Sequence, residues 1–82
     1  MTHYAADHLK DIARKSIEAE DKLAELFVTI AGITQEQALN LVAFYQRKKL
    51  VKLDLCNARL NVKHGAYLDK DYIEHCATLG AF

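Results

Sequence analysis

Six basic side chains lie within one stretch of 18 residues, and they are the groups of this chain best suited to binding chemistry. Residues 47–64 contain one acid, Asp54, and carry +5, whereas residues 1–46 carry −3 and residues 65–82 carry −2. Ammonium and guanidinium groups bind phosphate and carboxylate oxygens, and such a local excess attracts polyanions although the whole chain is neutral. The six are Arg47, Lys48, Lys49, Lys52, Arg59 and Lys63. The alternative is that they serve solubility, as lysines at strand edges often do.

Four other side chains just before this stretch can also contact a partner. Gln35, Gln37 and Asn40 carry amides, which can pair with two atoms of adenine at once. Phe44 is an aromatic group that we expect on the exposed side of the same segment, where it suits a protein contact. The alternative for Phe44 is a core position on a wide buried face.

The sequence gives little support for catalysis, metal binding or a cofactor. His3, His8, His64 and His75 are scattered, and the chain has only three glycines and no glycine-rich phosphate loop. Cys56 falls in an expected turn and Cys76 on an apolar helix face, where cysteine is usually inert packing. We therefore expect a protein that is not an enzyme and that needs no metal or cofactor.

Length and composition indicate one domain over residues 1–82. Apolar residues make up 51% of the 82, which is enough for a hydrophobic core. Two cysteines are too few for a disulfide framework, which favours a reducing, cytoplasmic setting. No targeting segment and no apolar run long enough for a membrane span is present. In these features the chain is similar to small accessory proteins of phages and mobile elements.

The elements that must position these groups begin with a long helical pattern over residues 5–30. Its apolar positions alternate steps of four and three, as in a heptad seam. The seam consists of Ala5, Leu9, Ile12, Ser16, Ala19, Leu23, Leu26 and Ile30. One such helix would be about 38 Å long, which exceeds the width of so small a domain. Either it breaks near Glu20 and Asp21, or its first part projects and pairs with a partner, most simply in a homodimer. The alternative to such pairing is a helix that packs on its own core.

Gly32 is expected to end this section, and a second helix is expected to start after Thr34. The sequence Thr34-Gln35-Glu36-Gln37 fits a capping box, in which the side chains of the first and fourth residues bond each other's backbone N–H. Ala38, Leu41, Val42 and Tyr45 have the spacing of one buried face.

Two short alternating segments, 51–55 and 59–63, predict a β-hairpin with one apolar and one basic face. Asn57 is expected to take the left-handed conformation in its loop. Asp69 can cap a last helix over about residues 70–79, with Leu79 inward. The predicted fold is mostly α with a small hairpin (α+β): a long N-terminal helix or helix pair, a capped second helix, the hairpin and a C-terminal helix.

This order resembles the winged helix-turn-helix class over about residues 21–64. With Gly32 at the turn glycine of that class, its apolar positions fall on Phe27, Ala31, Ile33, Ala38 and Leu41. Val28 stands where the class prefers a small residue.

The resemblance implies a DNA-binding, regulatory module. The second helix would enter the major groove with Gln35, Gln37 and Asn40, and the basic residues would contact phosphates. Glu36 and the neutral front of that helix favour the alternative. This is a protein–protein interaction module or inhibitor that binds an acidic protein surface, as a monomer or as a homodimer through residues 5–30.

Overall fold

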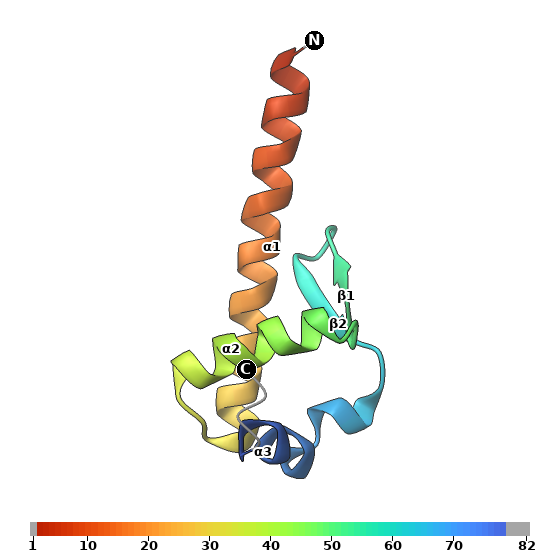
Figure 1. Ribbon diagram of the computed structural model, residues 1–82. Helices are drawn as coiled ribbons and strands as arrows, with labels where there is room; N and C mark the ends of the chain where they lie inside the picture. The colour runs from red at the N-terminus through yellow and green to blue at the C-terminus, as the bar shows by residue number, and fades with distance from the viewer. Residues whose placement is uncertain (1, 79–82) are drawn as a thin grey trace.

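A single helix, α1 (Thr2–Ala31), runs the whole length of the protein (Figure 1). A computed structural model describes residues 2–78 of the chain, with side chains from residue 8 onward. The molecule measures 48 × 23 × 20 Å along its principal axes, and 30 helical residues account for about 45 Å of the longest. The break near Glu20 is therefore wrong: α1 is continuous, its second half packs on the core and its first half projects.

Gly32 ends α1 in the left-handed conformation, as its position predicts. Its φ is +67°, and its N–H donates to the carbonyl of Val28 at 2.8 Å. A residue with a Cβ would be strained at this φ, so glycine supplies a low-cost exit from the helix. The chain then turns within three residues and enters α2 (Gln35–Arg47), which crosses α1 (Figure 1).

The predicted capping box is present at the start of α2. The Thr34 hydroxyl accepts from the Gln37 N–H at 3.1 Å, and Oε1 of Gln37 accepts from the Thr34 N–H at 3.0 Å. The predicted buried face of Ala38, Leu41, Val42 and Tyr45 is also confirmed. The capping box and the buried face both depend on residues a few positions apart in the sequence, so a helix of 13 residues forms them as predicted.

Replacing the cap residue should therefore destabilise the fold measurably. Thr34→Ala leaves the Gln37 N–H without its partner, and we expect a loss of about 1 kcal/mol in the free energy of unfolding, measured by urea denaturation. Thr34→Ser, which keeps the hydroxyl, is the matched control and should stay within about 0.5 kcal/mol of the wild type. Equal stability of the alanine and serine variants would show that the cap contributes nothing.

The hairpin consists of β1 (Val51–Asp54) and β2 (Arg59–Val62), paired antiparallel with Leu53 opposite Leu60. Its turn corrects one prediction, because Ala58 rather than Asn57 adopts positive φ, at +48°. The Asp54 carboxylate accepts from the N–H groups of Cys56 and Asn57 and from the Asn57 side chain. These bonds hold Asn57 within the turn, and the left-handed step moves to the next residue.

Two elements follow the hairpin, of which the first was not predicted. Gly65–Leu68 forms a short 3₁₀ helix, η1, and Lys70–Thr78 forms α3. The η1 segment matters for packing because the buried hydroxyl of Tyr45 donates a hydrogen bond to the carbonyl of Tyr67. The expectation for Leu79 lies outside the described residues.

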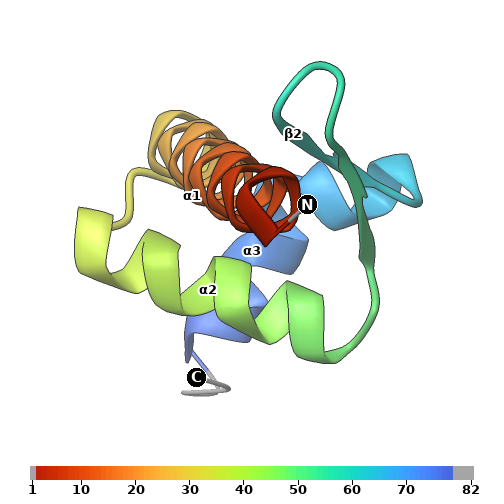
Figure 2. The same cartoon turned by 90° about the horizontal axis from the view of Figure 1, so that it is seen from above.

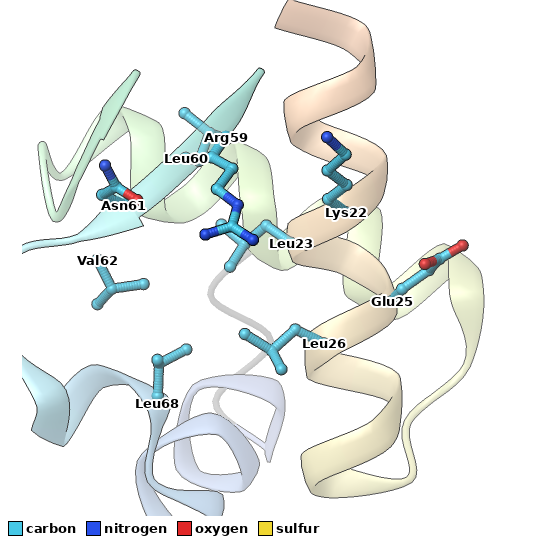
Figure 3. A pocket seen from close by; sticks show the side chains of 9 residues that line it. All are labelled: Lys22, Leu23, Glu25, Leu26, Arg59, Leu60, Asn61, Val62 and Leu68. Atoms are coloured by element: carbon cyan, nitrogen blue, oxygen red, sulfur yellow. The ribbon is translucent and has the colours of Figure 1, made fainter. Parts of the chain in front are cut away.

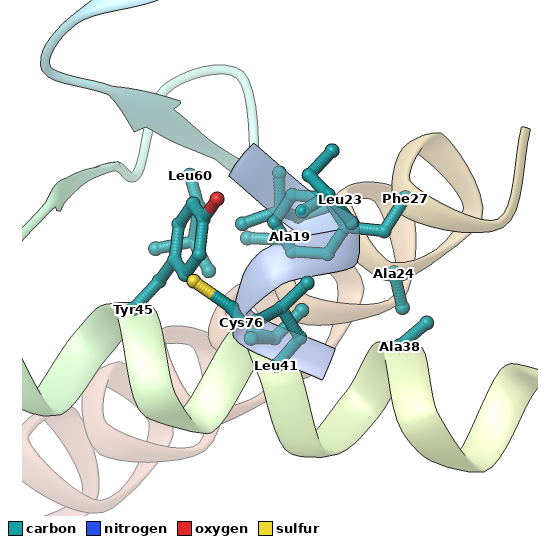
Figure 4. Close-up of a cluster of buried hydrophobic side chains, with 11 residues drawn as sticks. Ala19, Leu23, Ala24, Phe27, Ala38, Leu41, Tyr45, Leu60 and Cys76 are labelled. Atoms are coloured by element: carbon teal, nitrogen blue, oxygen red, sulfur yellow. The ribbon is translucent and has the colours of Figure 1, made fainter. Parts of the chain in front are cut away.

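The core lies where the second half of α1 crosses α2 and meets α3 and β2 (Figures 2 and 4). Phe27 and Tyr45 meet edge to face, with ring centroids 4.9 Å apart. Ala24 and Ala38 are both fully buried and bring the two helices close together (Figure 4). Val28, at the position where the winged helix-turn-helix class prefers a small residue, is partly buried against this core. The buried cluster comprises Ala19, Leu23, Ala24, Phe27, Ala38, Leu41, Val42, Tyr45, Leu60, Ile73 and Cys76.

Candidate nucleic-acid interface

Strand register places three of the six basic residues on the outward face of the hairpin. Residues opposite each other in an antiparallel pair point to the same side, and Lys52 pairs with Asn61 as Asp54 pairs with Arg59. Lys63 continues this face, since its N–H donates to the carbonyl of Leu50 at 2.9 Å. The predicted division into an apolar and a basic face therefore follows from the register.

Lys49, Lys52 and Lys63 border one hollow, of about 600 Å³, between the end of α2 and the hairpin. Its lining also includes the apolar side chains of Val51, Leu53 and Leu60. Lys49 reaches this position because it takes a left-handed conformation, with φ +57°, that turns the chain out of α2 and into β1. We call these three side chains the lysine cluster.

Arg59 lies apart from the lysine cluster, because it belongs to β2, the strand that lies next to α1. It borders a second hollow, of about 460 Å³, together with Lys22 and Glu25 of α1 (Figure 3). The Lys22 ammonium donates to the carbonyl of Asn57 at 3.3 Å and so ties α1 to the hairpin turn. Sequence reasoning missed Lys22, because only the tertiary fold brings it beside residues 57–59.

Asp54 is the one acid among the basic residues of 47–64, and its charge is fixed by the turn. The hydrogen bond from the Asn57 side chain, with backbone N–H donors of Asn57 and Cys56 and the charge of Arg59, lowers the pKa of Asp54 below its usual value. The carboxylate is therefore ionised near neutral pH and offsets Arg59, the residue opposite it. The hollow that the lysine cluster borders has no acidic residue in its lining.

The three amide residues lie toward the other end of α2. Gln35 and Asn40 are exposed, whereas Oε1 of Gln37 accepts from both the N–H and the hydroxyl of Thr34. Gln35 and Arg47 are the first and last residues of α2, about 18 Å apart at the rise of an α-helix. A partner that touches both sets must therefore extend along the whole helix.

Phe44 corrects the expectation of an exposed aromatic group. It is partly buried and packs against the core, with its ring centroid 6.3 Å from that of Tyr45. Lys48 lies over the outer side of the same ring, its ammonium 5.9 Å from the centroid, a cation–π contact. The alternative of a wide buried face describes Phe44 better. Arg47 is exposed at the end of α2.

Cys56, Cys76 and His64 each lie in a different element of the fold. Cys56 is exposed in the hairpin turn, and Cys76 is buried on the apolar face of α3, where burial raises its pKa. His64 uses Nδ1 to accept from the Ala66 N–H at 3.1 Å, which caps η1. Within the described part of the chain, no three metal-binding side chains come together.

Comparisons with known proteins add no assignment to this geometry. No family model, no curated protein and no solved structure matches the chain. Across residues 2–78, no helix has both the length and the apolar character that a membrane crossing requires.

Proposed function

We propose that this chain is a non-enzymatic, winged-helix-like DNA-binding module with a regulatory role in the cytoplasm. The observation that carries the proposal is the lysine cluster, which puts three cations around one hollow at the junction of α2 and the hairpin. In this arrangement α2 enters the major groove and the hairpin lies along the adjacent backbone as a wing.

The division of charge along α2 supports this placement. Gln35 and Asn40 have suitable amides for base edges, and both are exposed. The lysine cluster, with Arg47 at the helix end and Arg59 beyond it, has suitable cations for phosphates, which contribute affinity but no sequence information. In this proposal the basic hairpin supplies affinity for the DNA backbone, and the neutral helix recognises the base sequence.

Two observations favour a second candidate, an interaction module for an acidic protein surface. Leu39 is 39% exposed on α2, and Glu36 adds an acid near the end of the helix that would approach DNA. An exposed apolar side chain fits a protein contact better than a phosphate backbone, and Glu36 weakens the fit of this helix end to DNA. The lysine cluster would then bind carboxylates of the partner.

Binding to a DNA duplex, and the salt dependence of that binding, separate the two candidates. Binding of a fluorescent random-sequence duplex, followed by anisotropy, should weaken linearly in a plot of log affinity against log salt. Three to five phosphate contacts give a slope of about −3 to −5. Absence of duplex binding even at low salt would exclude the DNA proposal and leave the acidic protein surface. Binding without a salt slope would also contradict phosphate contacts.

A further inference from the structure

Between residues 8 and 18, the apolar side chains of α1 gain little burial from the rest of the described chain. We call residues 2–18 the arm and residues 19–78 the body, because Ala19 is the first buried side chain. No side chain of residues 8–18 is buried, and Leu9 and Ile17 are 65% and 60% exposed. Figure 1 shows the arm extending beyond the other elements.

The apolar stripe of the arm continues the face of α1 that packs on the body. Leu9, Ile12 and Ser16 follow the same heptad spacing as Ala19 and Leu23, which are buried against the rest of the protein. A partner that covers the stripe must therefore approach from the side on which α2 and the hairpin lie. Such a partner contacts the part of the body nearest to Ala19 as well as the arm.

The exposed surface of the chain is larger than a monomer of this mass should have. Size scaling gives about 5,000 Å² for a folded monomer of 9.3 kDa, whereas this chain exposes 5706 Å². The radius of gyration is 14.0 Å against about 12 Å expected for 82 residues. The excess surface, about 700 Å², is close to the roughly 800 Å² that each partner buries in a standard interface.

Charge on the arm fits a partner of the same composition. Residues 2–18 contain three acids and three bases, so two arms do not repel each other. Asp11 pairs with Arg14 at 2.7 Å and with Lys15 at 3.3 Å, which holds these charges along one flank of the helix. A neutral arm has no attraction for DNA, which separates it from the lysine cluster.

We propose that a second copy of this chain covers the arm and that the two arms pack antiparallel. In a parallel pair, residues 19–31 of one copy would run into α2 and the hairpin of the other, which occupy that side of α1. In an antiparallel pair, the N-terminus of the helix from the second copy reaches only as far as the start of the body. It therefore does not collide with α2 or the hairpin. The register that fits the heptad places Leu9 against Ile12 of the second copy, and Ser16 against its position 5.

This dimer is independent of the proposed DNA binding and is tested by mass in solution. Light scattering coupled to size exclusion should give twice 9.3 kDa for the wild type and a fall toward 9.3 kDa on dilution. Leu9→Glu places a charge in the seam and should give a monomer. Arg14→Gln changes the net charge by the same amount on the outer face and should stay dimeric.

Two outcomes of that experiment would overturn the proposal. A wild type that is monomeric at every concentration would leave the arm to an unrelated protein partner, and a dimeric Leu9→Glu variant would place the interface elsewhere. Because Leu9 lies outside the core, the melting transition of the body should be unchanged in this variant. Loss of that transition would show instead that Leu9 supports the fold of the monomer.

Cross-linking tests the antiparallel arrangement separately. In a Cys56→Ser background, the pair Ala5→Cys and Ser16→Cys should form intermolecular disulfides under mild oxidation. Ser16→Cys alone should not, because the antiparallel register separates the two copies of position 16 by about 16 Å along the axis. Efficient cross-linking of the single variant would mean that the arms run parallel.

Discussion

Leu41→Ala should lower the free energy of unfolding by about 2–5 kcal/mol, the largest single effect expected on stability. The Leu41 side chain has no exposed surface and lies in the middle of the buried face of α2. A domain of 82 residues has a total stability of about 4–12 kcal/mol, so this loss is a large part of it. Urea denaturation followed by circular dichroism measures the change.

Leu39→Ala is the matched control for this experiment. It removes the same atoms from the same helix, but Leu39 is 39% exposed, so we expect a loss below about 1 kcal/mol. Similar losses for the two variants would contradict the assignment of the buried face. Since α2 carries both the amides and the end of the basic stretch, its orientation decides which side chains reach a partner.

Removing the lysine cluster should produce the largest effect on binding. In a variant with Lys49→Gln, Lys52→Gln and Lys63→Gln, we expect duplex affinity at low salt to fall roughly 100-fold. The slope of log affinity against log salt should decrease in magnitude by about 3, because three phosphate contacts are lost. The three lysines are exposed, so the melting temperature should stay close to that of the wild type.

The control for this variant changes the net charge equally at other sites. Lys10, Arg14 and Lys70 are exposed and lie outside residues 47–64, and their replacement by Gln should leave duplex affinity within about threefold. Equal losses in both variants would show that only net charge matters. If neither variant lost duplex affinity, the lysine cluster would serve solubility and not DNA binding.

Periodicity predicted most of the fold because most of its elements are locally determined. The capping box at Thr34, the glycine exit at Gly32 and the alternation around Leu53 each depend on residues within a few positions of one another. The continuity of α1 was left open for a physical reason. Helix propensity and heptad spacing are the same for a helix that folds back on its core and for one that projects from it.

The features that sequence reasoning missed depend on contacts between distant segments. The η1 segment that accepts the Tyr45 hydrogen bond was not predicted, and the partial burial of Phe44 was left as one of two alternatives, because both are products of the packed core. Lys22 belongs to an acidic part of the sequence, yet it lies beside the hairpin turn. The basic stretch likewise looked continuous along the chain, whereas the fold separates Arg59 from the lysine cluster.

Helix formation in the arm should depend on the concentration of the protein. Most of the stability of a helix in a protein comes from the packing of its apolar face, and the side chains of residues 8–18 gain little such packing from the body. In a monomer the amides of the arm should therefore open at almost no free-energy cost, whereas those of α2 are protected by the core. If association supplies the missing support, helix formation in the arm and pairing are one equilibrium. Any activity that needs two copies would then switch on over the concentration range in which the arm becomes ordered.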